Sequence, residues 1–133
     1  MGALQLVGVH DFQRMNQVLI TYPVERNRLD IFTQFLTPAD VEPAAIRQAE
    51  LTPMIVQLVA SQRGVTALPN WALTEFLNPA SIRTCRLGEH GIWRTLYATV
   101  RSEDLQADYV QAYMAQARET CFKSLQGIVA AQP

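Results

Sequence analysis

The turn TYPVERN (21–27) has the residue types to bind a small anion. It lies between the apolar run VLITY (18–22) and the amphipathic run RLDIFTQFL (28–36). A strand that ends at such a turn and a helix that begins there expose backbone amides, with the positive end of the helix dipole behind them. These amides suit a carboxylate, and the side chains of Arg26 and Arg28 would strengthen that preference.

A second turn, AELTP (49–53), offers the same geometry through Thr52, and Glu50 could receive an amine. A plainer interpretation applies to both turns. Charged residues before a helix are usually solvated, and Asn27 can cap a helix without any ligand. The spacing alone leaves both interpretations open.

Three amphipathic runs predict the helices that would position these turns. Apolar spacing predicts helices over 28–36, 53–63 and 107–125, and a shorter one over 70–77 that the breaker Asn78-Pro79 ends. Asn27 and Thr52 are the expected N-caps of the first two, with Pro53 at the first helical position of the second. The expected buried face of 53–63 consists of Met54, Ile55, Leu58 and Val59. The stripe on 107–125 consists of Val110, Met114, Ala117, Cys121 and Leu125.

Short apolar runs alternate with these helices and predict an α/β fold. Expected strands are 18–22, which should be covered on both faces, and then 44–51, 65–69, 81–87 and 93–100. Helices between successive strands imply right-handed crossovers and a mainly parallel sheet. Ligands of such sheets collect beyond the carboxyl ends of the strands. Both charged turns are expected beyond the carboxyl end of a strand.

Composition narrows the class of protein. The chain has 133 residues, enough for one domain, and its 11 basic and 12 acidic side chains nearly cancel, which disfavours direct DNA binding. Cys85 and Cys121 have no CxxC spacing and fit reduced, packed thiols. No basic leader or stretch of 18 apolar residues occurs, so a cytoplasmic location is expected, without membrane association.

No catalytic or cofactor motif stands out. His10 and His90 are the two histidines, and neither lies near Cys121 in sequence, so neither suggests an activated nucleophile. Trp71 and Trp93 are expected to be core anchors. The chain has no phosphate-binding loop, dinucleotide fingerprint or metal-ligand spacing, and we expect no catalytic residue, metal or cofactor.

Three segments resemble the effector-binding domain of LysR-type transcriptional regulators. They are ITYPVERNRLDIF (20–32), QLVASQRGVTALPNW (57–71) and LGEHGIWRTLYATVR (87–101), and the resemblance covers most of positions 10 to 123. Within the family, the three together are most similar to the activators of methionine biosynthesis, whose coregulator is homocysteine.

The resemblance implies part of a two-subdomain module like the periplasmic binding proteins. Residues 10–90 would form most of the second subdomain, and 91–126 the strand and C-terminal helix that return to the first. The DNA-binding helix-turn-helix domain of the family has no counterpart in these residues, so contact with DNA would run through a separate domain.

The resemblance also implies a site and a partner. An amino-acid-like effector would lie against both turns, with Tyr22 and Val24 as walls and the amides near Asn27 holding its carboxylate. The implied effector-binding residues are Tyr22, Pro23, Val24, Arg26, Asn27, Glu50, Leu51 and Thr52.

Half of the implied cleft lies outside these residues, so we expect weak effector binding by this chain. We also expect self-association through the apolar sides of 93–100 and 107–125. Two other functions stay open: a small α/β enzyme acting on an anionic substrate, and a module for dimerisation only.

Overall fold

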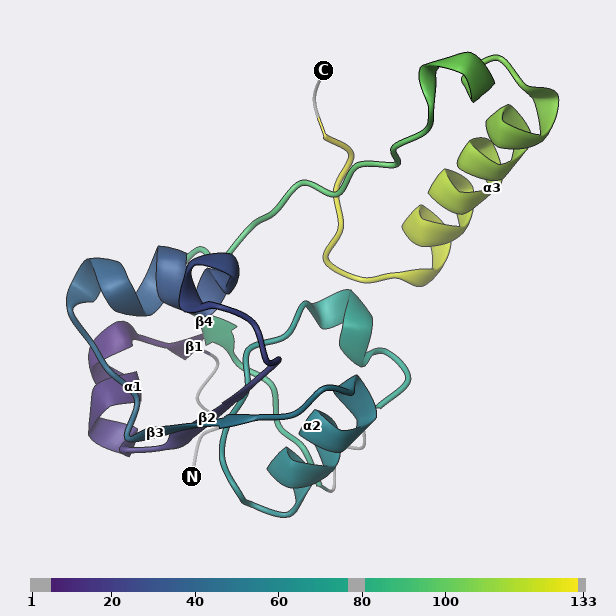
Figure 1. Ribbon diagram of the computed structural model, residues 1–133. Helices are drawn as coiled ribbons and strands as arrows, with labels where there is room; N and C mark the ends of the chain where they lie inside the picture. Colours follow the sequence, from purple (N-terminus) through teal and green to yellow (C-terminus); the bar gives the residue numbers. More distant parts are fainter. Residues whose placement is uncertain (1–5, 77–80, 132–133) are drawn as a thin grey trace. The chain divides into compact units, whose positions relative to one another are not determined.

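The computed structural model describes residues 6–76 and 81–131 (Figure 1). The chain divides into two compact units. Unit 1 comprises residues 1–68 and 76–93, and unit 2 comprises residues 69–75 and 94–133. Each unit is described by itself below.

The strand β2 (Val18–Thr21) is the centre of unit 1. It pairs in parallel with β3 (Ala45–Gln48), with Val18 opposite Ala45 and Thr21 opposite Gln48. On its other side, Val65 forms a parallel bridge with Leu19, and the Ile20 amide donates to the Val65 carbonyl at 2.8 Å. The parallel pairing confirms the prediction, but the strand expected over 65–69 is reduced to this bridge.

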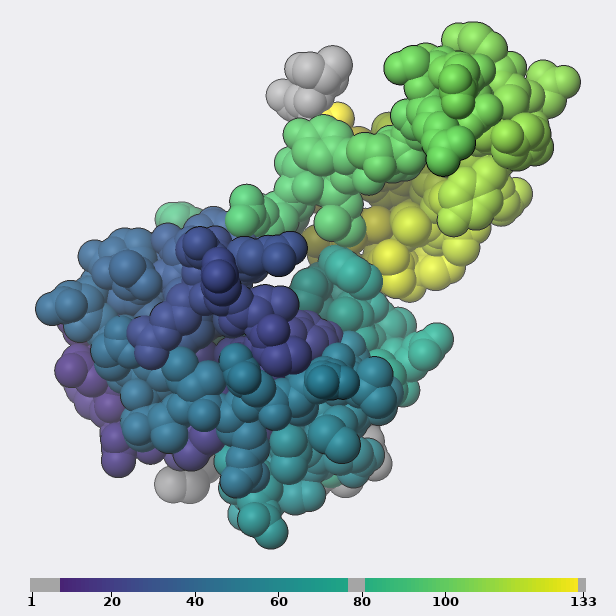
Figure 2. Space-filling model, in the orientation of Figure 1, coloured from purple at the N-terminus to yellow at the C-terminus, as the bar shows by residue number. Residues whose placement is uncertain are grey.

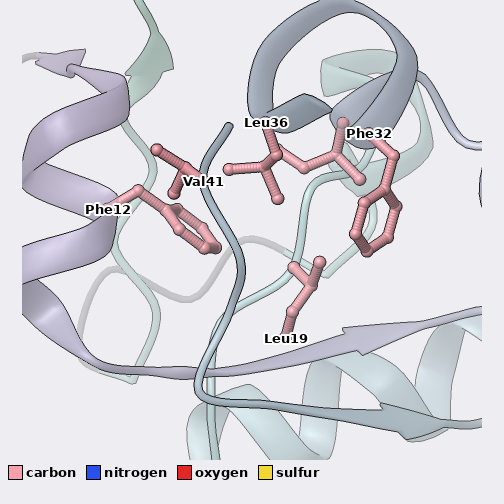
Figure 3. Close-up of a cluster of buried hydrophobic side chains, with 6 residues drawn as sticks. Phe12, Leu19, Phe32, Leu36 and Val41 are labelled. Atoms are coloured by element: carbon pink, nitrogen blue, oxygen red, sulfur yellow. The ribbon is translucent and has the colours of Figure 1, made fainter. Parts of the chain in front are cut away.

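Side chains cover β2 on both faces, as its apolar run predicts. Leu19 packs in a cluster with Phe12 from α1 (Val9–Met15) and with residues of the π-helix Ile31–Leu36 (Figure 3). Its neighbour Ile20 points to the opposite face, where it packs with Ala49 and with Ile55 of α2 (Thr52–Ala60). Neither Leu19 nor Ile20 is exposed at all. Two hydrophobic layers therefore hold the strand from which the first charged turn begins.

The helix expected over 28–36 begins later and has a different form. Residues Arg26–Arg28 form a 3-10 turn that ends at the extended residue Leu29, and a π-helix then runs from Ile31 to Leu36. Asn27 therefore lies inside the 3-10 turn, and the prediction that it caps the helix is wrong. The wider π turn brings residues five apart to one side, so Ile31 and Leu36 are both buried. A second 3-10 turn, Thr37–Ala39, follows the π-helix directly.

The helix α2 corrects the predicted cap and buried face. Leu51 is the N-cap, and Thr52 is already helical, so the prediction of Thr52 as cap is wrong by one position. Met54, expected in the core, is 55% exposed, whereas Ile55 and Val56 are buried. Leu58 and Val59 are half-buried against the Ile20 cluster, as expected.

Two further segments of unit 1 differ from the sequence prediction. The helix α1 was not predicted at all. Of the strand expected over 81–87, only β4 (Arg86–Leu87) forms, in parallel with β1 (Leu6–Val7). The sheet is accordingly two separate parallel pairs. Among the described residues, the strand expected over 93–100 is absent: the segment has no regular secondary structure, because no neighbouring strand receives its backbone bonds.

Unit 2 contains the long helix α3 (Asp108–Ser124), which confirms the helix predicted over 107–125. Its expected stripe is half-buried, while most of its other residues are exposed. Asn70–Leu73 is a 3-10 turn with Pro69 as N-cap, so the helix expected over 70–77 is shorter. The breaker Asn78-Pro79 lies outside the described residues. The Asn70 side chain donates to the Gln126 carbonyl at 2.7 Å and joins this turn to the end of α3.

Two predictions of buried side chains are wrong. Trp71 and Trp93 are exposed rather than core anchors, because the described core gathers around β2 and consists of aliphatic and phenylalanine side chains. Cys85 is exposed and Cys121 half-buried, and both are free thiols. No helix within the described residues is long and apolar enough to cross a bilayer.

Candidate functional site

The parallel pairing of β2 and β3 places both charged turns at one edge of the sheet. Tyr22 follows β2 directly, and residues 49–52 follow β3 directly. The Ala49 amide donates to the Thr21 carbonyl at 2.9 Å, which continues the pairing past the last strand residue. At this edge the Tyr22 hydroxyl and Oγ1 of Thr52 form a hydrogen bond of 2.5 Å. The two turns, predicted separately from the sequence, are therefore in direct contact.

This edge combines apolar and polar groups. Tyr22 and Thr52 are half-buried, while Val24 and Leu51 present exposed apolar side chains. α2 begins here, and amides in the first turn of a helix have no carbonyl partner within the helix. Glu50, directly before the helix, is exposed. These groups could bind a small molecule that carries a carboxylate, an amine and a short apolar chain.

The charged side chain of Arg26 pairs with a carboxylate that does not belong to this edge. Its guanidinium donates to both carboxylate oxygens of Glu42, each at 2.9 Å, and lies 4.8 Å from the ring centre of Phe32. Glu42 comes before β3 in the chain, whereas the site edge follows β3. Arg26 thus has a partner at the opposite end of that strand. Pro23 and Asn27 are exposed.

A third segment, residues 65–68, also reaches this edge, although the sequence pattern had not indicated it as part of the site. Residues 65–68 run beside β2, where the Thr66 hydroxyl donates to the Ile20 carbonyl at 2.8 Å. Leu68 packs in the same cluster as Tyr22 and Ile20. The sequence did contain a signal for this segment, because a strand was predicted over 65–69 and the carboxyl ends of parallel strands lie at the same edge of a sheet. Thr66 and Leu68 therefore help to hold the site in place. Effector binding by the eight residues named earlier stays a prediction.

Other reactive groups lie apart from this edge. Although the residue Cys85 is exposed overall, packing around its sulfur raises the pKa of the thiol, because burial disfavours the thiolate. A raised pKa leaves a smaller thiolate fraction at neutral pH and does not suggest a nucleophile. Among residues 6–76 and 81–131, no group of three or more His, Cys, Asp or Glu side chains could hold a metal ion.

Parallel strands whose following turns meet at one edge are typical of α/β binding domains. Comparison with known proteins gives the family of this one. Residues 8–122 match the LysR substrate binding domain. The chain belongs to this family, and its fold is that of LysR regulatory domains, which are periplasmic-binding-protein-like.

The individual relatives are all regulators named MetR. The chain is 37% identical over 103 residues to the HTH-type transcriptional regulator MetR of Escherichia coli K12, covering 77% of this chain and 32% of that protein. It is 39% identical over 90 residues to MetR of Buchnera aphidicola, covering 68% of this chain and 28% of that protein. The chain thus spans about a third of the length of these relatives.

A solved structure is similar as well. The regulatory domain of MetR, a LysR family regulator from N. meningitidis, superposes with a TM-score of 0.80 at 34% identity. The match covers 96% of this chain and 58% of that domain. The resemblance noted in the sequence is therefore confirmed at the level of family and fold.

Proposed function

We propose that this chain is the effector-sensing and self-associating part of a LysR-type regulator of methionine biosynthesis, with homocysteine as its coregulator. Its family membership and the name MetR shared by the relatives support this role. The chain itself catalyses nothing in this proposal. It works in the cytoplasm, and contact with DNA runs through a helix-turn-helix domain of the parent protein.

One observation at the candidate site supports an amino acid as the effector. The Tyr22–Thr52 hydrogen bond joins the two turns, so that the first amides of α2 and the carboxylate of Glu50 lie at one edge. An α-amino acid carries a carboxylate for the amides and an ammonium for Glu50. Val24 and Leu51 offer apolar surface to a short thiol-bearing side chain. Homocysteine has all three groups.

The proposal keeps the domain division that the sequence resemblance implied. In this proposal residues 10–90 form most of the second subdomain, and residues 91–126 supply a strand and helix that complete the first. A small amino acid depends on burial and on several convergent polar groups for its affinity. Since this chain spans 58% of the N. meningitidis domain that it matches, it would contribute one wall of the effector site. Binding by the chain alone would then be weak.

Calorimetric titration with homocysteine tests this function. We expect a measurable dissociation constant for a chain lengthened to the size of the matched regulatory domain, and little or no heat for residues 1–133. In the longer chain, Thr52→Val should weaken binding by at least about tenfold, because the hydroxyl that joins the two turns is lost. Methionine serves as a ligand control with the same amino and carboxyl groups but a methylated sulfur.

A variant outside the candidate edge provides the matched control. Thr33→Val removes an exposed hydroxyl from the π-helix and should leave homocysteine affinity unchanged. Equal affinity of the Thr52→Val and wild-type forms would exclude the proposed edge. Absence of binding by the longer chain would exclude homocysteine as the effector.

A further inference from the structure

The hydrogen bond between Tyr22 and Thr52 leaves one hydroxyl proton without an acceptor. Each of the two hydroxyls carries a single proton, and the bond between them, at 2.5 Å, uses only one of these protons. Within residues 6–76 and 81–131, neither hydroxyl forms a second hydrogen bond. Both side chains are half-buried, which limits the water that could accept the second proton. The pair can therefore donate one hydrogen bond to a bound molecule.

The chemistry of the two hydroxyls decides which of them donates outward. A phenol is a stronger donor than an aliphatic hydroxyl, whereas the aliphatic oxygen is the better acceptor. Tyr22 therefore donates to Oγ1 of Thr52, and the proton of Thr52 remains for the bound molecule. The Tyr22 ring is held in place, since it packs against the cluster of Ile20, Ala49 and Ile55. A fixed ring keeps the Thr52 hydroxyl in one orientation, and its donation also makes that hydroxyl a better donor.

The first turn of α2 has one backbone donor fewer than an ordinary helix. Pro53 lies at its second helical position and has no amide proton, and the apolar N-cap Leu51 forms no side-chain cap bond. Helical side chains lean toward the N-terminus, so the Thr52 hydroxyl is directed to the same end as the remaining amides. Segment 49–60, blue to teal in Figure 2, lies at the surface of unit 1 in that view. The Thr52 hydroxyl therefore takes the place of the donor that Pro53 lacks.

We propose that Tyr22 is a positioning residue, which aims the Thr52 hydroxyl at the carboxylate of the effector and makes the site prefer an acid to the corresponding amide. This inference rests on the proposed function, because it requires an effector at this edge. A hydrogen bond to an ionised acceptor is roughly twice as strong as one to a neutral acceptor. The NH₂ group of an amide ligand would also bring donors toward a hydroxyl and backbone amides that are themselves donors. Both effects favour a carboxylate.

Titration of the longer chain with homocysteine and with its carboxamide tests this role. The two ligands share the ammonium and the thiol, so the ratio of their dissociation constants isolates the contribution of the carboxylate. We expect the wild-type form to bind the acid at least about tenfold more tightly than the amide. Thr52→Val should lower this ratio at least about fivefold, and Tyr22→Phe, which keeps the ring, should lower it about threefold. Thr52→Ser retains a hydroxyl and should retain the ratio.

A double variant separates positioning from packing. In the Thr52→Val background, Tyr22→Phe should leave the ratio of the two dissociation constants unchanged, because Tyr22 acts on the carboxylate only through the Thr52 hydroxyl. Tyr109→Phe is the matched control, since it removes a hydroxyl from an exposed tyrosine of α3 and should change neither dissociation constant. Circular dichroism would verify that each variant is folded.

Two outcomes would overturn the positioning role. An equal ratio in the wild-type and Thr52→Val forms would mean that another part of the regulatory domain, not the effector, accepts the Thr52 proton. An equal effect of Tyr22→Phe with and without the Thr52 hydroxyl would make Tyr22 a packing residue.

Failure of the proposed function gives a different result. If homocysteine does not bind but methionine does, homocysteine is not the effector, and methionine with its carboxamide then measures the same ratio. If neither acid binds the longer chain, both proposals are wrong.

Discussion

The hydroxyl of Tyr22 lies 2.5 Å from Oγ1 of Thr52, across a separation of 30 residues in the sequence. Tyr22 follows β2 directly, and Thr52 begins α2 after β3. The bond therefore fixes two turns at the carboxyl edge of a parallel strand pair. This contact gives the candidate effector site a defined geometry in unit 1.

Removing either hydroxyl should destabilise unit 1 modestly. Tyr22→Phe and Thr52→Val each delete one partner of a half-buried hydrogen bond, and we expect a loss of about 0.5–1.5 kcal/mol in the free energy of unfolding. The double variant should lose less than the sum of the two, with a coupling of about 1 kcal/mol. Urea unfolding measures all four forms. Tyr109→Phe, at an exposed position on α3, is the control, and strictly additive losses would argue against the bond.

Gly64 should tolerate no side chain. A Cβ at this position would lie 2.4 Å from the Val18 carbonyl oxygen, because the backbone passes directly beside β2. Gly64→Ala should therefore cost at least about 2–3 kcal/mol of stability, since backbone rather than a flexible side chain must move. Gly88→Ala is the comparison: its φ of +65° also disfavours alanine, but the nearest atom belongs to the Phe35 side chain at 3.7 Å. A loss of about 1–2 kcal/mol is expected there. Equal losses at both positions, by thermal or urea unfolding, would refute the steric argument.

Neighbouring positions on α2 should respond very differently to alanine. Ile55 is fully buried between α2 and β2, so Ile55→Ala should cost about 2–5 kcal/mol through lost contacts and the cavity left behind. Met54 faces solvent, and Met54→Ala should change the free energy of unfolding by less than about 0.5 kcal/mol. Chemical denaturation of the two variants measures the difference. A large loss of stability for Met54→Ala would mean that Met54 belongs to the buried face of α2, as its spacing in the sequence predicted.

The Arg26–Glu42 ion pair should contribute little and should depend on salt. Both side chains are more than half exposed, at 54% and 67%, so solvent screens their attraction. Glu42→Gln should lower stability by at most about 1 kcal/mol in dilute buffer, and the difference should shrink in molar salt. Glu25→Gln, an exposed carboxylate directly before the same 3-10 turn, is the control. A loss that does not change with salt would show that Glu42 acts through packing instead.

The local sequence pattern was sufficient to predict several parts of this structure. The apolar run at 18–22 predicted a strand covered on both faces, and Leu19 and Ile20 are fully buried on opposite sides. The spacing in 107–125 predicted α3 almost to its ends. Both features depend on near neighbours in the chain, because side-chain period and helix propensity are properties of short segments. The resemblance to LysR-type effector domains was also readable in three segments and was confirmed by the family match.

Contacts between distant residues decided the rest. Arg26 was predicted to favour an anionic ligand, but its partner is Glu42, which no local pattern could identify. Thr52 was predicted as a cap, yet its hydroxyl bonds to Tyr22 and Leu51 takes the cap position. The apolar run at 93–100 has the composition of a strand, but a strand also needs a paired neighbour, and the described chain provides none. Sequence by itself determined which segments are apolar, amphipathic or charged. Tertiary structure decided their partners, because hydrogen bonds and ion pairs form between groups that only the fold brings within reach.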